Sequence, residues 1–316
     1  MNNKIIALDT QGKVLWHESL PAASFSTPAV HNDMVFVGCD NMFERFGGSL
    51  YAFDKNSGEE IWNTSIGLVG RSSPVVYGGN VLIITKSQVA PLRWNTNLFV
   101  IDEMTGEMKW NRTLDDNITG FANMPKDVIG FLEEIGFVND TDNVPMNNLL
   151  GAITPVIHNG VIFAGSSDGN IYAIDSNTGS LIWTFDTSSS PLGLSNYMAA
   201  SPVIADGIVY AISGDGVIYA IDEITGEEKW TNVIEDEAGF SLVVSSPIVS
   251  NGFLYVNQFS LMGRNLYCIG SYKENLKGRV ISKTIEIPKG FWWDRFKAET
   301  FNTTGNDVVF LSLIHI

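Results

Sequence analysis

The chain has 316 residues, of which 45% are hydrophobic and 17% charged, so it carries enough apolar side chain for a large buried core. Its 35 acidic residues against 19 basic ones give a net charge of −16. This balance excludes nucleic acid as an expected partner, because phosphate neutralisation needs clustered Lys and Arg. No apolar run reaches the roughly 18 residues of a membrane-spanning helix, so we expect no membrane-spanning segment.

The first predicted element, residues 5–16 (IIALDTQGKVLW), is a hairpin that recurs along the chain. Each copy has an apolar run, an Asp, and a Gly four residues before a Trp. The tryptophans are Trp16, Trp62, Trp110, Trp183 and Trp230, and the glycines are Gly12, Gly58, Gly106, Gly179 and Gly226. Asp can bond its own backbone and Gly accepts a positive φ without steric cost, so the segment between them predicts a turn joining two strands.

A second shared signal precedes each later hairpin: Ser or Thr, then Pro, then an apolar run, a short polar turn and another strand. The prolines are Pro28, Pro74, Pro155, Pro202 and Pro247. Together the two signals predict four strands per unit. Units of 45 to 48 residues, apart from insertions, match the length of a four-stranded propeller blade.

Residues 5–287 therefore resemble the PQQ-like β-propeller repeat, whose pattern is A-x-D-x-x-T-G-x-x-x-W. The resemblance implies an all-β propeller of four-stranded antiparallel blades, in which the Trp of one blade docks against the next. It marks as structural docking residues Trp16, Trp62, Trp110, Trp183, Trp230, Gly58, Gly106, Gly179 and Gly226. More remotely, the chain resembles the propeller lipoprotein of outer-membrane barrel assembly and the quinoprotein alcohol dehydrogenases.

The repeat is incomplete at both ends. The chain enters at the third strand of a blade, and after the last third strand, residues 266–270, Gly270 replaces the Asp and Ser282 the Trp. We expect five four-stranded blades plus a half-blade in an incomplete ring, and a fragment of a longer chain. Residues 1–287 form the propeller, and residues 288–316 either begin an appended β-module or supply a strand that closes a six-bladed ring.

Two features bear on the cellular compartment. Cys39 and Cys268 belong to the second and last repeats, so we expect free, largely buried thiols. Five N-x-[ST] sequons begin at Asn63, Asn111, Asn117, Asn139 and Asn302. Such sequons indicate an extracellular, cell-surface or periplasmic protein, although this chain shows no signal peptide.

The insertions fall on one face of the predicted propeller, where second strands join third strands and where blades join each other. NMFERFGG, KSQVAPLRWNTN and QFSLMGR lengthen three blades there, whereas two others use the tight turns Asp168-Gly169 and Asp215-Gly216. Exposed aromatic and Arg side chains supply most hot-spot energy, so we expect a partner to bind on this long-loop face. The candidate residues are Phe43, Arg45, Phe46, Arg93, Trp94 and Arg264. The alternative is that the aromatic side chains pack beneath their own loops or beneath a helix predicted over residues 125–137.

The largest insertion, residues 115–150, is predicted to contain a short helix over residues 125–137. Its apolar side chains recur at three- and four-residue spacing, at Val128, Phe131, Leu132 and Ile135. We expect the helix to lie across the propeller as a plug over the central channel. The alternative is a lid that gates a ligand.

Enzyme chemistry is not predicted. Resemblance to quinoprotein dehydrogenases implies an adjacent cysteine pair, a catalytic Asp and calcium ligands, but this chain has no adjacent cysteines and its recurrent Asp residues belong to turns. The four histidines are scattered, and His31 and His158 occupy the same turn in different repeats. We therefore predict no catalytic, cofactor-binding or metal residues, and neither PQQ nor calcium. The predicted function is a non-catalytic binding or scaffolding propeller for an unidentified protein or surface polymer; the alternative is a PQQ-dependent dehydrogenase or a degenerate relative.

Overall fold

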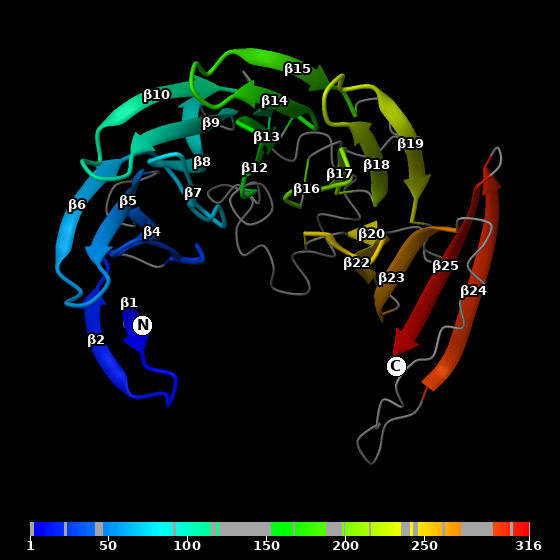
Figure 1. The fold of residues 1–316 in the computed structure, drawn as a ribbon, viewed down its shortest axis with the longest axis horizontal. Coiled ribbons are helices and arrows are strands. Elements are labelled where there is room, and N and C mark those ends of the chain that lie inside the picture. The colour runs from blue at the N-terminus through cyan, green and yellow to red at the C-terminus, as the bar shows by residue number, and fades with distance from the viewer. Residues whose placement is uncertain are drawn as a thin grey trace.

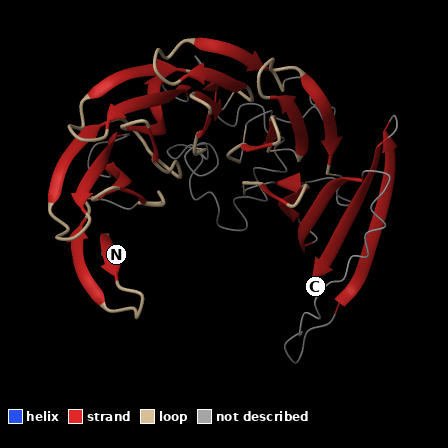
Figure 2. Ribbon diagram, in the orientation of Figure 1, coloured by secondary structure: helices blue, strands red, loops and turns tan. Residues whose placement is uncertain are grey.

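The computed structural model describes residues 3–21, 24–41, 47–90, 93–114, 118–119, 153–166, 168–187, 198, 200–214, 216–234, 241–242, 246–260, 263–272, 293–303 and 306–315. Only the backbone is described for residues 41, 88, 90, 93–94, 118–119, 241–242, 258–260, 263–265, 271–272, 293–303 and 306–315. The elements in these ranges are all β-strands, grouped into sheets around a centre (Figure 1). The ring of sheets is not closed, and the N-terminal and C-terminal strands flank the gap (Figure 2). The prediction of an all-β propeller with an incomplete ring is confirmed.

The N-terminal half follows the predicted order of strands. A half-blade of two strands comes first: β1 (Lys4–Leu8) and β2 (Val14–Ser19). Blade A consists of β3 (Ala29–His31), β4 (Met34–Asn41), β5 (Gly47–Asp54) and β6 (Glu60–Ser65). Blade B consists of β7 (Val75–Tyr77), β8 (Asn80–Ala90), β9 (Arg93–Asp102) and β10 (Met108–Thr113), with β11 (Ile118–Thr119) added on β9.

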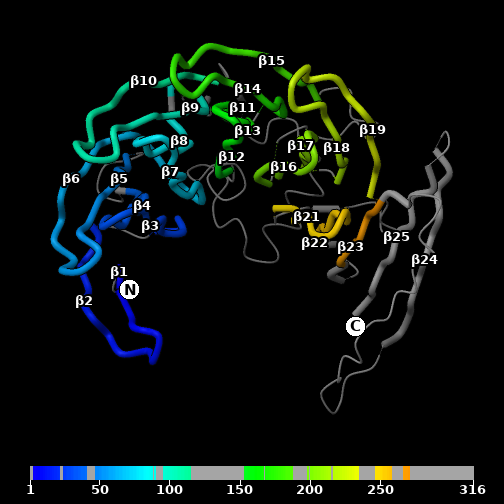
Figure 3. Tube along the Cα trace, in the orientation of Figure 1, coloured from blue at the N-terminus to red at the C-terminus, as the bar shows by residue number. Residues whose placement is uncertain are grey.

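The C-terminal half continues the ring. Blade C consists of β12 (Val156–His158), β13 (Val161–Gly165), β14 (Ile171–Asp175) and β15 (Leu181–Phe185). Blade D consists of β16 (Val203–Ala205), β17 (Ile208–Ile212), β18 (Val217–Asp222) and β19 (Glu228–Val233). Blade E consists of β21 (Ile248–Ser250), β22 (Phe253–Ser260), β23 (Gly263–Tyr272) and β25 (Asn306–His315), with β24 (Trp293–Thr303) outside β25 and β20 (Ser241–Leu242) on β22. In blades A to D the first strand lies toward the centre and the fourth toward the rim (Figure 3).

The outer part of blade E differs from the other blades. β25 pairs with β23 from Arg264↔His315 to Tyr272↔Asp307, so the fourth position is filled from late in the chain. The decayed motif explains this late pairing, because Gly270 stands where the other blades have the Asp that begins the tight turn. Ser282 lies outside the described residues. Neither β24 nor β25 pairs with the half-blade among the described strands, so the hypothesis that the C-terminal strand closes the ring was wrong.

The third and fourth strands share one register in every copy of the hairpin. A small or β-branched residue lies opposite each Trp, and the pairing shifts by one residue beside it. The pairs are Ala7↔Trp16, Ala52↔Trp62, Val100↔Trp110, Ala173↔Trp183 and Ala220↔Trp230. A β-bulge increases the local twist of a strand, so this shift helps to aim the indole at the neighbouring blade.

The hydrophobic core lies between the blades. Alternate residues of a strand point to opposite faces of its sheet, so each blade packs against the blade on either side. Between blades C and D, for example, Phe163 and Trp183 meet Val209 and Tyr219 in one buried cluster. Equivalent clusters join the half-blade to A, A to B, B to C and D to E. Each blade is therefore stabilised mainly by its neighbours.

Two of three smaller predictions can be compared with the structure. Cys39 is buried, Cys268 is partly buried, and neither forms a disulfide, as predicted. The helix predicted over residues 125–137 lies outside the described residues. Within the described part of the chain, no helix is long and apolar enough to cross a membrane.

Candidate functional site: the blade interfaces and the long-loop face

The recurrent Asp residues hold the hairpin turns. Oδ1 of Asp102 accepts the N–H groups of Met104 and Thr105, each at 3.0 Å, and Nζ of Lys109 lies 3.0 Å from Oδ2. These contacts lower the pKa of Asp102 to about 2, and the hydrogen bond from Lys109 has the largest effect, followed by that from the Thr105 N–H. Asp54, Asp175 and Asp222 make the same turn contacts, and the pKa of each is likewise lowered. These carboxylates are therefore occupied by their own turns.

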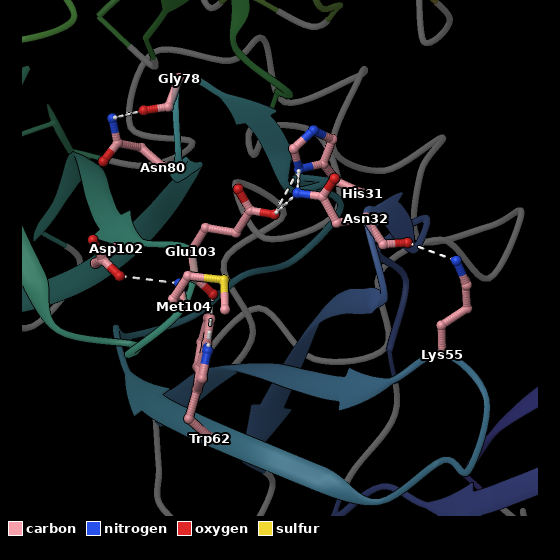
Figure 4. Close-up of polar contacts among 9 residues, drawn as sticks. All are labelled: His31, Asn32, Lys55, Trp62, Gly78, Asn80, Asp102, Glu103 and Met104. Atoms are coloured by element: carbon pink, nitrogen blue, oxygen red, sulfur yellow. Dashed lines mark hydrogen bonds and ion pairs between the residues drawn. The ribbon is translucent and has the colours of Figure 1, made fainter.

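Each Trp from the half-blade to blade C lies over the turn glycine of the next blade. The Trp62 indole covers Gly106, where a methyl group would lie only 2.6 Å from Cδ2 of the ring. The same approach joins Trp16 to Gly58, Trp110 to Gly179 and Trp183 to Gly226. The indole N–H of Trp62 also donates to the Glu103 carbonyl at 3.1 Å (Figure 4). Trp230 packs beside Tyr210 at a ring distance of 5.9 Å, as Trp183 does beside Phe163 at 5.7 Å, and it belongs to the cluster between blades D and E.

A buried carboxylate adds a second contact between blades A and B. Nδ1 of His31 lies 2.6 Å from Oε1 of Glu103, and Nδ2 of Asn32 donates to the same oxygen at 3.3 Å (Figure 4). The Glu103 side chain is only 3% exposed, whereas His31 is 47% exposed. Blade A therefore holds Glu103 twice, at its carbonyl through Trp62 and at its carboxylate through His31.

The same arrangement recurs between blades C and D. Nδ1 of His158 lies 2.5 Å from Oε1 of Glu223, and the Glu223 carbonyl accepts the Trp183 indole N–H at 3.1 Å. At the interface between blades B and C the equivalent positions hold Tyr77 and Ser176. The His–Glu contacts thus couple A with B and C with D. Sequence reasoning placed both histidines in one kind of turn but missed their partners. The sequence signal for these partners is that the turn Asp is followed by Glu in blades B and D and by another residue in the other hairpins.

Replacing His31 with Ala should lower the free energy of unfolding by about 1–2 kcal/mol, because it removes the main hydrogen-bond partner of a buried carboxylate. The loss should be at most half as large in a Glu103→Gln background, since the amide carries no charge to be left unpaired. Urea unfolding of the four proteins of this double-mutant cycle measures the difference. An equal loss in both backgrounds would show that the two side chains act independently.

The Ser and Thr residues that precede the inner strands also join the blades. Each backbone N–H donates to the hydroxyl of the equivalent residue in the following blade. The pairs are Thr27 to Ser73 at 2.9 Å, Ser73 to Thr154 at 3.0 Å, Thr154 to Ser201 at 2.9 Å and Ser201 to Ser246 at 3.1 Å. The Ser/Thr-Pro signal of the sequence is therefore a chain of hydrogen bonds around the centre of the ring.

The long-loop face, opposite the Asp–Gly turns, carries long hairpins. β8 and β9 have 11 and 10 residues, against five each in β13 and β14. At the far end of the β8–β9 hairpin β11 pairs with Arg93 and Trp94, and at the far end of the β22–β23 hairpin β20 pairs with Phe259 and Ser260. Each of these two hairpins is thus widened to three strands near its tip.

The predicted binding-face residues are only partly placed. Arg93 and Trp94 stand at the start of β9, and Arg264 stands near the start of β23, opposite Phe259. All three therefore belong to hairpin tips, and only their backbone is described. Phe43, Arg45 and Phe46 lie outside the described residues. Their role as a binding surface remains a prediction.

Sequence reasoning missed a set of polar side chains at the strand ends of the long-loop face. Lys86 is 1% exposed, and its Nζ donates to Oγ1 of Thr96 at 2.6 Å. Ser166 of blade C reaches the same Oγ1 at 3.3 Å. The Asp40 carboxylate accepts the N–H groups of Val69 and Gly70, and burial raises its pKa against their lowering effect. The described residues contain no group of three or more His, Cys, Asp or Glu able to hold a metal ion.

The comparisons with known proteins agree with this architecture. The family model PQQ_2, described as outer membrane protein assembly factor BamB, matches residues 1–128 and 134–304. The chain belongs to this family. Its inter-blade Trp–Gly contacts and Ser/Thr hydrogen bonds are thus features of a BamB-family propeller.

Relatives of this BamB-family chain include enzymes and a protein named for assembly. It is 25% identical over 215 residues to tetrathionate hydrolase of Acidithiobacillus ferrooxidans, covering 58% of this chain and 40% of that protein. It is 25% identical over 177 residues to outer membrane protein assembly factor BamB of Yersinia pestis, covering 54% and 36%. It is 32% identical over 152 residues to polyvinylalcohol dehydrogenase of Sphingopyxis sp., covering 44% and 20%. The chain spans less than half the length of these curated relatives.

Two solved structures share the fold. BamB from Moraxella catarrhalis matches with a TM-score of 0.56 at 18% identity, over 98% of this chain and 76% of that one. A europium-containing methanol dehydrogenase matches with a TM-score of 0.55 at 13% identity, over 85% and 59%. At these identities the likeness concerns the fold alone.

Proposed function

We propose that this chain is a non-catalytic binding or scaffolding propeller that holds a protein partner on its long-loop face, in an extracytoplasmic compartment or at the cell surface. The observation that carries the proposal is the hairpin β8–β9, with β11 added at its tip. Its strands exceed those of blade C by five or six residues, roughly 15–20 Å of extended chain. In blades A to D, the described connections on the opposite face are short turns.

A projecting hairpin of this kind suits recognition. Backbone pairing holds the Arg93 and Trp94 backbone between β8 and β11, so the two residues are ordered before a partner arrives. Preorganisation lowers the entropy lost on binding, and Arg and Trp are the residue types that dominate hot spots. Val89, beside the tip, is 52% exposed and supplies apolar surface there.

Two further observations support the location. The net charge of −16 and the sequons fit a protein exposed outside the cytoplasm. A relative at 25% identity is named as an outer membrane protein assembly factor. Protein assembly outside the cytoplasm is therefore the setting in which we place the proposed partner.

The binding proposal predicts that the double variant Arg93→Ala/Trp94→Ala loses partner capture while its free energy of unfolding stays within about 1 kcal/mol of wild type. A photocrosslinking residue at Val89 should capture the partner when Arg93 and Trp94 are present but not in the double variant. Mass spectrometry then identifies the captured partner. The matched control places the same crosslinker at Ile224, which is 83% exposed on the short-turn face. A stability loss of several kcal/mol would make Arg93 and Trp94 core residues, and equal capture at Val89 and Ile224 would contradict a binding face.

The alternative function, a quinone-dependent dehydrogenase, is favoured by the polyvinylalcohol dehydrogenase among the relatives. The turn Asp carboxylates and Asp40 already accept backbone N–H groups, which argues against these groups as the calcium ligands of a PQQ site. We expect millimolar calcium with micromolar PQQ to leave the melting temperature unchanged, since a ligand stabilises in proportion to its occupancy of the native state. A clear rise with PQQ present would overturn the non-catalytic proposal.

A further inference from the structure

Two sequons occupy the same place on neighbouring blades. Asn63 directly follows Trp62 on β6, and Asn111 directly follows Trp110 on β10. Both Asn side chains are exposed, and so are the hydroxyl-bearing residues two positions later, Ser65 and Thr113. Residues two apart lie on one face of a strand. Each sequon therefore has its amide and its hydroxyl side by side on the exposed face of its strand, where the Thr113 hydroxyl also donates to Oδ1 of Asn97 at 3.0 Å.

The residue in the middle of each sequon points the other way and fixes this orientation. Oγ1 of Thr64 donates to the Gly106 carbonyl of blade B at 2.6 Å. Nη1 of Arg112 donates to the Gly179 carbonyl of blade C at 2.8 Å. Together with the adjacent Trp, these contacts hold the strand against the next blade, so the Asn faces outward in both copies.

The two amides are engaged only by other exposed side chains of their own strands. Nδ2 of Asn63 donates to Oε1 of Glu60 at 2.6 Å, and Nδ2 of Asn111 lies 3.1 Å from Sδ of Met108. Glu60 is exposed and Met108 is 50% exposed, so each can rotate away without disturbing a core. Among the described strands, β6 and β10 are the outermost of their blades, which leaves their outer edges to solvent.

We propose that Asn63 and Asn111 are N-glycosylation sites, an inference that rests on the proposed extracytoplasmic location. The donor is an oligosaccharide carried on a polyprenyl phosphate or pyrophosphate. The bond between Nδ2 and the anomeric carbon forms as the bond from that carbon to the carrier oxygen breaks. The carrier leaves with the electron pair, and the amide loses one proton.

The attached sugars would cover the outer edges of blades A and B. Exposed strand edges invite pairing with other chains, and a bulky polar group beside them prevents it. The sugars would also shield Ile61 and Met108, which are 45% and 50% exposed on the same strands. In blades C and D the equivalent positions hold Thr184 and Thr231, so the modification would distinguish one half of the rim from the other.

The test uses the full chain, secreted from yeast behind an added signal sequence, with one reference sequon in a C-terminal tag. Release of the sugars by a peptide N-glycosidase, which hydrolyses the side-chain amide, in ¹⁸O water converts each occupied Asn into a labelled Asp, which peptide mass spectrometry locates. We expect label at Asn63 and Asn111. Asn63→Gln and Ser65→Ala should each remove the first site, and Asn111→Gln and Thr113→Ala the second.

An occupied reference sequon with either Asn63 or Asn111 unmodified would overturn the proposal. Because the added signal sequence sets the route, this outcome is independent of the native location and of any partner. Loss of crosslinking at Val89, in contrast, would count against the binding function and leave the two sites unaffected.

Discussion

Replacing Trp183 with Ala is expected to lower the free energy of unfolding by about 3–5 kcal/mol, the usual cost of emptying a large aromatic site in a core. Trp183 is 9% exposed and belongs to the cluster that joins blades C and D. The substitution removes its ring contact with Phe163, 5.7 Å between centroids, and its hydrogen bond to the Glu223 carbonyl. Since a blade is stabilised mainly by its neighbours, the lost interface weakens both blades.

The neighbouring substitution Ile182→Ala is the matched control. Ile182 lies on the same strand but is 48% exposed, so its truncation should cost well under 1 kcal/mol. Denaturant unfolding, monitored by circular dichroism, compares the two variants with wild type. A loss below about 1 kcal/mol for Trp183→Ala would contradict a docking role for this side chain.

The fold was predictable because each blade repeats the same short sequence pattern, and the residues of that pattern act locally. Asp175 and Gly179 define the turn, and Trp183 fixes where the fourth strand passes the third. These three residues act within one hairpin or on the next blade, so one unit of sequence contains most of the information. Spacing was therefore sufficient to predict four-stranded blades and their order, and the resemblance to the PQQ-like repeat added the expectation of an incomplete ring.

Features that depend on pairs of blades could not be predicted in the same way. The His31–Glu103 contact joins residues 72 positions apart, and neither residue has chemistry that requires the other. Only the alternation of His in blades A and C with Glu in blades B and D signals the pairing. Likewise, β25 pairs with β23 across a long connection without a turn motif, which local pattern cannot specify.

The candidate site was predictable only as a face. Insertion lengths placed the long hairpins on one side of the propeller, and β8 and β9 are indeed the long strands of blade B. The polar residues at the strand ends, such as Lys86 and Asp40, stand at positions that blades C and D fill with Ser or Gly. A single charged residue in an apolar strand gives no indication of its partners, because these come from other segments of the chain.

A matched pair of glycines separates docking from backbone strain. Gly226 and Gly207 share a φ of +74°, but a methyl group at Gly226 would lie 2.7 Å from Cδ2 of Trp183, whereas at Gly207 it would meet nothing within 4 Å. Gly207→Ala should therefore cost about 1–2 kcal/mol, the price of a left-handed backbone for an L-residue. Gly226→Ala should cost a further 1–3 kcal/mol or so from the clash with the indole.

The two costs can be told apart in a Trp183→Ala background. With the indole gone, Gly226→Ala should cost no more than Gly207→Ala, because only the strain of the positive φ remains. Unfolding free energies of the four single and double variants test this directly. Equal costs for the two glycine substitutions in the wild-type background would mean that the Trp183 indole shifts to accommodate a methyl group at residue 226 at no measurable cost. The close approach of Trp183 to Gly226 would then not explain why glycine follows the turn at this position.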